Sequence, residues 1–147
     1  MYRHILIPTD GSRLSKKAIV QGVALARALG AKVTGVFAAP PAVPMIYDDF
    51  IPAGYPDPDE QARSRERRAR LHLAVVEAAA AKAGVACRTV YVANTHPAEA
   101  IMATAKKAGC DVICMASHGR RGLAGVLLGS ETQKVLTYSK LPVLVCR

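Results

Sequence analysis

The chain has 147 residues, of which 51% are hydrophobic, 5% are aromatic and none is tryptophan. This length suits one domain with its own core, and the hydrophobic content excludes a disordered chain. The few aromatic side chains argue against stacking on single-stranded nucleic acid, while the formal net charge of +9 favours an anionic partner.

No targeting or membrane segment is recognisable. The opening MYRHILIPTDGS has only the apolar residues Ile5, Leu6 and Ile7 before Pro8, far short of a signal-peptide core. No apolar run approaches the roughly 20 residues that a membrane-spanning helix needs. The four cysteines include no C-x-x-C pair, which is typical of buried, reduced thiols. We therefore expect a cytoplasmic protein.

Short apolar runs alternate with helical patterns along the chain. The predicted strands cover residues 4–10, 31–38, 86–92, 110–116 and 141–146. The predicted helices run from Ser12 or Ser15 to about Leu29, from about Pro58 to Ala83, over 95–109, and from Ser130 to about Tyr138. A Pro- and Asp-rich irregular segment at about 39–58 separates the second strand from the second helix.

The ends of these helices carry recognisable signals. Gly30 is the expected stop of the first helix. Thr95 or His96 is the expected cap of the third helix, with Pro97 in its first turn, and Ser130 is the expected cap of the fourth. Within the predicted strand 110–116, two cysteines would lie about 13 Å apart, too far for a disulfide.

Strands separated by helices predict a single-domain α/β three-layer sandwich with a parallel sheet. In such sheets, ligands bind beyond the carboxyl ends of the strands, where the strand order reverses. The loops PTDGS, after the first strand, and ASHGRRGLAGVLLGS, after the fourth, have unusual chemistry. If these two strands are neighbours, both loops face one crevice.

The Gly-rich loop has two interpretations. Glycines let backbone N–H groups approach a phosphate, and Gly129-Ser130 stands where a helix N-terminus adds its dipole. Arg120 and Arg121 add positive charge nearby. The alternative is a plain flexible connection, because the loop is neither a P-loop nor a dinucleotide fingerprint.

Four further features also have two interpretations. Asp10 could hold a ribose hydroxyl or a nucleotide-bound Mg²⁺, or only organise the turn. His118 has no Ser, Cys or carboxylate at a recognisable catalytic spacing, so we interpret it as a pocket-lining or loop-anchoring residue. Interleaved acidic residues favour a solvated helix face over a nucleic-acid site for the arginine run 63–70. His96 fits a cap better than a ligand, and no His/Cys/Asp cluster has metal-site spacing.

The segments ILIPTDGS, HGRRGLAGVLLGS and KLPVLVCR give the whole chain a resemblance to single-domain universal stress proteins. The nucleotide-binding branch of that family carries G-x2-G-x9-G-[S/T]. Here Gly119 is followed by nine residues and then Gly129-Ser130, while Ala116 replaces the first glycine.

The resemblance implies a Rossmann-like, adenine nucleotide alpha hydrolase-like fold of strand order 3-2-1-4-5, with ATP or AMP as the ligand. It implies adenine recognition by backbone groups near Val36, and phosphates held by the Gly-rich loop and the helix that follows it. His118 and Arg120 join this implied site from the reading of the residues themselves. The full expected site is Pro8, Thr9, Asp10, Val36, Met115, Ala116, His118, Gly119, Arg120, Gly129, Ser130, Glu131 and Thr132.

Ala116 should weaken rather than abolish nucleotide binding. If the backbone at this position needs a positive φ, the methyl group costs roughly 1 kcal/mol, and otherwise it only takes up pocket space. The leading hypothesis is a regulatory protein for which the nucleotide is a signal, since the sequence offers no catalytic base or transferring nucleophile. The alternatives are a partner-binding stress protein without nucleotide, active through the irregular segment, and a slow ATPase.

The last predicted strand, Leu141 to Cys146, is apolar and lies at the sheet edge in the implied strand order. An exposed apolar edge needs a cover, and a second copy of the strand is the simplest one. Members of the resembled family often associate in this way. We therefore expect a homodimer through this strand.

Overall fold

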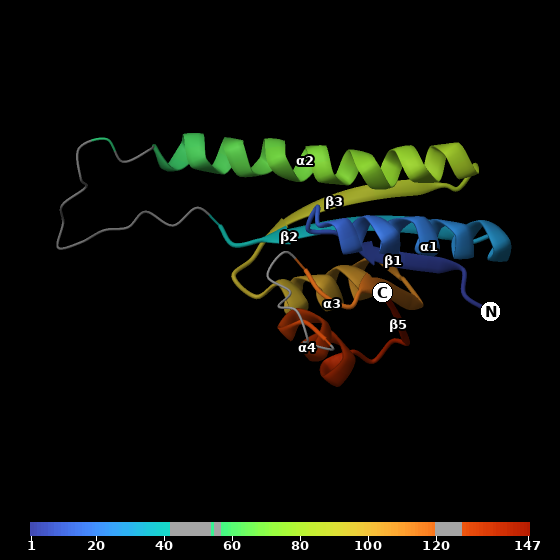
Figure 1. Ribbon diagram of the computed structural model, residues 1–147. Helices are drawn as coiled ribbons and strands as arrows, with labels where there is room; N and C mark the ends of the chain where they lie inside the picture. Colours follow the sequence, from blue (N-terminus) through green and yellow to red (C-terminus); the bar gives the residue numbers. More distant parts are fainter. Residues whose placement is uncertain (42–53, 55–56, 120–127) are drawn as a thin grey trace.

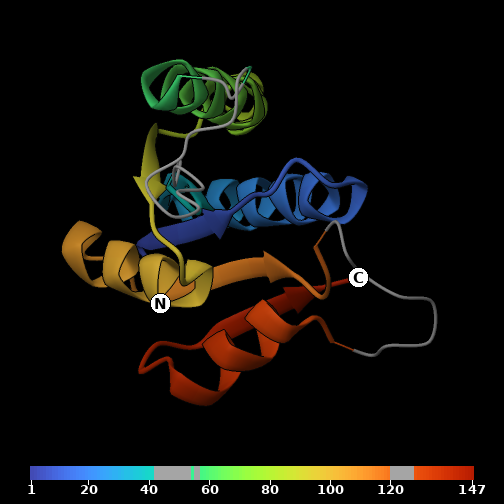
Figure 2. The same cartoon turned by 90° about the vertical axis from the view of Figure 1, so that its left-hand side faces the viewer.

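A computed structural model describes residues 1–41, 54, 57–119 and 128–147. These residues form one five-stranded parallel sheet of order β3-β2-β1-β4-β5, flanked by helices on both faces (Figures 1 and 2). The strands are β1 (His4–Pro8), β2 (Lys32–Ala39), β3 (Cys87–Ala93), β4 (Val112–Ala116) and β5 (Val143–Cys146). The helices are α1 (Arg13–Leu29), α2 (Pro58–Ala83), α3 (Pro97–Ala108) and α4 (Ser130–Tyr138). The predicted fold class and strand order are confirmed.

Strand β1 lies in the middle of the sheet and all five of its residues are buried. Its side chains alternate between two cores, as a strand covered on both faces requires. Ile5 and Ile7 pack in a cluster with residues of α1 and α2, whereas Leu6 packs in a cluster with residues of α3 and α4. The helices α1 and α2 therefore cover one face of the sheet, and α3 and α4 cover the other (Figure 1).

Helix α1 has two possible starts in the sequence, Ser12 and Ser15, and the structure shows which of them is used. Ser12 is the N-cap, and its hydroxyl accepts the N–H of Ser15 at 3.1 Å. Gly30 ends the helix with a φ of 64°, a left-handed conformation that glycine adopts without strain.

Three strands are shorter than predicted. β1 ends at Pro8 because the next residues form a turn, and β5 begins at Val143 after Pro142. β4 begins at Val112 because Cys110 belongs to the end of α3, where its N–H donates to the Ala105 carbonyl at 2.9 Å. The prediction that Cys110 lies in the fourth strand is therefore wrong.

All four cysteines are free thiols, three of them buried and Cys87 partly exposed. The Sγ atoms of Cys114 and Cys146 lie 3.6 Å apart between the neighbouring strands β4 and β5. Burial, together with the neighbouring Cys146, raises the pKa of the Cys114 thiol, and burial raises the pKa of Cys110 to about 11. Both thiols therefore stay protonated at neutral pH.

A buried polar network joins the amino ends of β1, β2 and β3. The side chain of His4 is 3% exposed, and its Nε2 lies 2.7 Å from Thr34 Oγ1. Arg88 Nε donates to the same Thr34 oxygen at 3.1 Å. Burial lowers the pKa of His4, and the positive charges of Lys32 and Arg88 lower it further, while Asp111 opposes them.

Helix α2 is only half packed. Its buried residues all lie in its second part, from Ala69 onward, and the first part projects beyond the carboxyl ends of the strands (Figure 1). Arg65 Nη1 donates to the carbonyls of Pro40 and Pro41 and so holds the end of β2 to this part of the helix. Most of the irregular segment at about 39–58 lies outside the described residues. No helix in the described part of the chain is both long and apolar enough to span a membrane.

Candidate functional site

The loops that follow β1 and β4 lie at the same edge of the sheet. The two strands are hydrogen-bonded neighbours, with Ile5 opposite Val112 and Leu6 opposite Ile113. Because both strands run in the same direction, their carboxyl ends and the loops that follow meet at the point where the strand order reverses. The adjacency that the crevice prediction required is therefore present.

The turn after β1 is tightly organised by its own side chains. Asp10 Oδ1 accepts the N–H of Ser12 at 2.9 Å, and Thr9 Oγ1 accepts the N–H of Gly11 at 3.2 Å. The turn also joins β2, since Thr9 N donates to the Val36 carbonyl at 2.9 Å and Pro8 lies opposite Val36. The turn-organising interpretation of Asp10 is thus correct for one of its two carboxylate oxygens.

The second carboxylate oxygen of Asp10 faces the Gly-rich loop. A Cβ atom on Gly119 would lie 2.6 Å from Asp10 Oδ2, closer than any side chain tolerates. A Cβ atom on Gly129 would lie 3.3 Å from His118 Cα and 3.7 Å from Gly119 N. The two motif glycines and Asp10 therefore meet in one place, and the missing side chains let the backbones approach.

Helix α4 begins at this place with an open N-terminus. Gly129 is its N-cap and provides no side-chain cap, so the prediction that Ser130 is the cap is wrong. Ser130 is instead the first helical residue. No acceptor among the described residues meets the N–H groups of Ser130, Glu131 and Thr132. These donors and the helix dipole form an anion-binding arrangement.

Ala116 causes no backbone strain. It is the last residue of β4 and pairs with Cys146, so its backbone is extended. Its methyl group is 7% exposed and packs in the cluster on the α1 side of the sheet, and its carbonyl accepts the Thr132 hydroxyl at 3.0 Å. Met115 is also buried, in the cluster on the opposite face. The positive φ considered from the sequence is therefore not required.

His118 has a hydroxyl partner that the sequence interpretation missed. Its Nδ1 lies 2.8 Å from the Oγ of the preceding residue, Ser117. Ser117 is only 1% exposed, and its N–H donates to the Cys146 carbonyl at 2.8 Å. A hydroxyl so enclosed is poorly presented to a ligand, so the contact orients the imidazole at the start of the loop.

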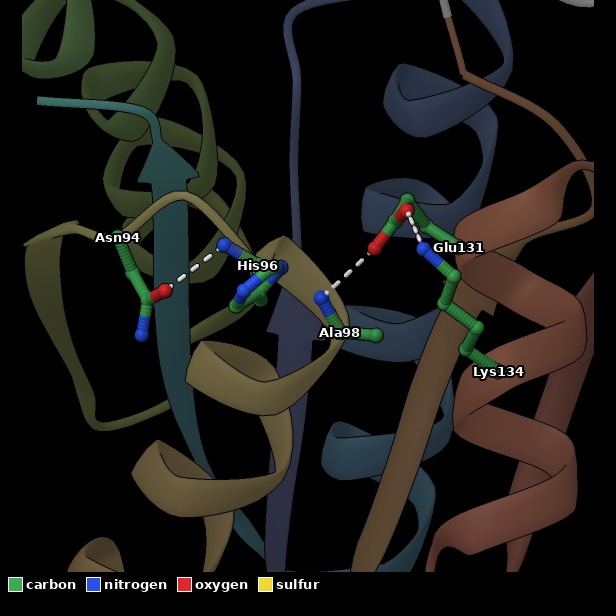
Figure 3. Close-up of polar contacts among 5 residues, drawn as sticks. All are labelled: Asn94, His96, Ala98, Glu131 and Lys134. Atoms are coloured by element: carbon green, nitrogen blue, oxygen red, sulfur yellow. Dashed lines mark hydrogen bonds and ion pairs between the residues drawn. The ribbon is translucent and has the colours of Figure 1, made fainter.

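The Glu131 side chain points to the start of α3 (Figure 3). Its Oε2 accepts the N–H of Ala98 at 2.8 Å, and its Oε1 pairs with Lys134 Nζ at 2.9 Å. Only its backbone N–H belongs to the open helix end. Asn94 Oδ1 accepts the N–H of His96, the N-cap of α3, at 2.8 Å.

His72 is a site neighbour that no sequence pattern indicates. A Cβ atom on Gly11 would lie 2.2 Å from His72 Cε1, so the imidazole rests directly on the turn after Asp10. The ring also stacks on Phe37, with centroids 5.4 Å apart. In the sequence, His72 is one polar residue in a long helix, and only the packing of α2 on this turn reveals its place.

No group of three or more His, Cys, Asp or Glu residues could hold a metal ion in the part of the chain that the structure describes. Arg120 and Arg121 lie outside the described residues. On α2, Arg70 pairs with Glu66 on the exposed surface, as expected for a solvated helix face.

Comparison with known proteins relates the whole chain to one family. The universal stress protein family model matches residues 1–147. The chain is 32% identical over 154 residues to universal stress protein YxiE of Bacillus subtilis and 34% identical over 149 residues to a universal stress protein of Thermus aquaticus, with 100% of both chains covered in each case. Among solved structures, MJ0577 of Methanocaldococcus jannaschii matches with a TM-score of 0.83 at 27% identity, covering 99% of this chain and 96% of that chain.

Two more distant structures were solved with nucleotides. A universal stress protein in complex with cAMP matches with a TM-score of 0.66 at 24% identity, covering 99% of this chain and 97% of that one. A universal stress protein of Archaeoglobus fulgidus in complex with dAMP matches with a TM-score of 0.69 at 17% identity, covering 99% and 98%. At these identities the similarity establishes the fold alone.

Proposed function

The chain belongs to the universal stress protein family, and from that premise we propose that it is a cytoplasmic regulatory protein that binds an adenine nucleotide, ATP or AMP. The nucleotide lies in the crevice between the loops after β1 and β4. It acts as a signal whose presence changes what the protein does, and its hydrolysis is slow or absent.

The observation that carries this proposal is the convergence of Asp10, Gly119 and Gly129 at the open end of α4. A Cβ on Gly119 would lie 2.6 Å from Asp10 Oδ2 and would displace this carboxylate, whereas glycine leaves the carboxylate in place and the backbone accessible to a phosphate. The open N–H groups that follow Gly129 supply donors for the phosphate oxygens. A plain flexible connection needs neither feature.

The remaining residues take roles that follow from their surroundings. Asp10 Oδ2 would accept from a ribose hydroxyl or meet a Mg²⁺ carried by the nucleotide. Pro8 and Thr9, which are joined to Val36, would line the base side, where backbone groups near Val36 read adenine. The other members of the proposed site are Met115, Ala116, His118, Arg120, Ser130, Glu131 and Thr132.

Relatives support the choice of ligand. One universal stress protein was solved with cAMP and another with dAMP, and both ligands contain adenine and a phosphate. The net charge of +9 favours such an anion over a neutral nucleoside.

The direct test has two arms. Freshly purified protein is denatured, and the supernatant is separated by anion exchange to detect adenine nucleotide that copurified. The protein is also titrated with Mg-ATP and with AMP by calorimetry. We expect binding of at least one of them, and loss of that binding in Asp10→Ala. Absence of nucleotide in both arms would refute the proposal, and rapid turnover of ATP that Asp10→Ala abolishes would favour an enzyme instead.

We also propose that the protein forms a homodimer through β5. Among the described residues, this strand is at the sheet edge and has β4 as its single neighbour. Leu144 on β5 is 43% exposed, and Leu136 and Tyr138 on the adjacent α4 are also exposed. Pairing with a second copy would cover these apolar side chains and the free backbone groups of the edge.

A further inference from the structure

A single side chain connects the first turn of α4 to the first turn of α3 (Figure 3). The Glu131 carboxylate accepts the Ala98 N–H at 2.8 Å. The N-cap of α3, His96, makes no side-chain capping bond, so Glu131 supplies from another helix a cap that the local sequence lacks. Val135, one turn further along α4, packs in the same buried cluster as Ala98. The hydrogen bond therefore fixes the end of a helix whose later turn is already packed.

The same carboxylate is a negative charge in the first turn of the helix that faces the proposed phosphate position. Left alone, it would repel a phosphate. Two features oppose that repulsion, the ion pair with Lys134 at 2.9 Å and the positive end of the α3 dipole. The hydrogen bond to Glu131 raises the pKa of Lys134, as expected when the two charges attract each other.

We propose that Glu131 is a positioning residue for nucleotide binding. Its carboxylate holds the first turn of α4 against α3, so that the open N–H groups of Ser130 and Thr132 keep their direction toward the phosphate. Lys134 and the start of α3 neutralise its charge. This inference rests on the proposed function, in which Glu131 contributes its backbone N–H, and it gives a separate role to the Glu131 side chain, which does not touch the ligand.

The hydrogen bond between the Ala98 N–H and the Glu131 carboxylate is called the tether below. Two neutral variants separate the effect of the tether from the effect of the Glu131 charge. Glu131→Gln removes the charge and keeps an oxygen that accepts from Ala98, whereas Glu131→Ala removes both. The first measurement uses the protein without nucleotide, by hydrogen exchange of the Ala98 and Gln133 amides in NMR. We expect these amides to exchange about fivefold faster in Glu131→Ala than in Glu131→Gln, the ratio for loss of one net hydrogen bond.

The second measurement is calorimetric titration with Mg-ATP. Glu131→Ala should bind about fivefold more weakly than Glu131→Gln, although the two proteins carry the same charge. Glu131→Gln should bind at least as tightly as the wild-type protein. In Lys134→Met the Glu131 charge is uncompensated, so binding should weaken while the exchange of Ala98 stays within about twofold of wild type.

The outcomes are distinguishable. Equal exchange of Ala98 in Glu131→Ala and Glu131→Gln would disprove the tether. If the Ala98 amide exchanges faster in Glu131→Ala than in Glu131→Gln but both variants bind Mg-ATP equally well, the tether is purely structural. The positioning role of Glu131 is then wrong. A wild-type protein that binds no adenine nucleotide refutes the proposed function and the role of Glu131 in it, and the exchange ratio then decides only whether the tether exists.

Discussion

At Gly11, backbone conformation and close packing both demand glycine. Its φ is +79°, which L-residues with a side chain rarely adopt, and an added Cβ would lie 2.2 Å from His72 Cε1. Gly11→Ala should therefore lose about 1–2 kcal/mol through backbone strain and about 1–3 kcal/mol through displacement of the ring. Chemical denaturation measures the loss as a lower free energy of unfolding.

Gly30→Ala is the matched control, because Gly30 has a φ of +64° and no atom within 4 Å of an added Cβ. Gly30→Ala should therefore lower the free energy of unfolding only by the backbone strain, about 1–2 kcal/mol. In the double variant Gly11→Ala/His72→Ala no ring is displaced, so the loss that Gly11→Ala causes by displacing the ring should disappear. If Gly11→Ala lowers the free energy of unfolding no more than Gly30→Ala does, displacement of the His72 ring has no measurable cost.

Gly129→Val should remove nucleotide binding and leave the fold intact. The backbone of Gly129 has φ −70° and ψ 155°, which valine adopts without strain. Its added carbons would crowd His118 and the Gly119 N–H at the proposed phosphate position. We expect at least a tenfold loss of Mg-ATP affinity, roughly 1.4 kcal/mol or more. A melting temperature near that of wild type excludes unfolding as the cause, and wild-type affinity would move the phosphate elsewhere.

Ala116→Gly is the companion variant, and the structure alters what we expect from it. From the sequence, restoring the motif glycine should hold or improve affinity. Because the Ala116 methyl is buried in β4, its removal should also destabilise the fold by about 1 kcal/mol, since glycine is less favourable in a strand and a buried methyl is lost. Affinity and the free energy of unfolding are therefore measured together.

At the level of elements, the network that joins the amino ends of β1, β2 and β3 makes stability depend on pH. The unfolded chain protonates His4 near its usual pKa of 6.5, whereas the folded protein holds that pKa lower. Below pH 6.5 the unfolded state therefore binds more protons. The contribution of His4 to the free energy of unfolding is fully present above pH 6.5. It is lost as the pH drops toward the folded-state pKa of His4.

His4→Gln should flatten this pH dependence. Urea denaturation of wild type and variant at several values between pH 5 and pH 7.5 measures the slope, and an NMR titration of the imidazole follows the protonation directly. His96→Gln, which changes an exposed histidine, is the control. A wild-type slope retained in His4→Gln would assign the pH dependence to other groups.

At the level of the whole molecule, the exposed edge at β5 predicts a dimer. A lysine at Val143 would test this edge poorly, because Val143 packs against the core cluster and the change would also disturb folding. Leu144→Lys is sharper because this side chain is already 43% exposed. We expect light scattering to give a dimer for wild type at tens of micromolar and a monomer for Leu144→Lys.

Leu71→Lys is the matched control for the dimer test, since Leu71 is an exposed apolar residue on α2, which packs on β2 and β3 at the other side of the sheet. This variant should remain a dimer. A monomeric wild type, or a Leu144→Lys variant that stays dimeric, would place association on another surface or remove it.

The strand order and the approach of the loops after β1 and β4 could be predicted from local patterns and the family resemblance. The buried apolar run around Ile5 and the glycine stops are local signals, and so is the Gly129-Ser130 pair. Contacts that depend on how separate helices pack were missed. His72 on Gly11 and Glu131 on Ala98 join residues 61 and 33 positions apart, and neither side chain belongs to a periodic pattern.

Strand β1 precedes the other four described strands in the chain, yet it takes the middle place in the sheet, and β5 follows them and joins the edge. Asp10 therefore leaves the ribosome more than one hundred residues before the Gly-rich loop and the first turn of α4 that complete its crevice. A growing chain can pair β1 with β2 and cover one face of them with α1 and α2. It cannot complete the proposed nucleotide crevice until the first turn of α4 has been made, so capture of the proposed nucleotide would follow the early folding steps rather than guide them.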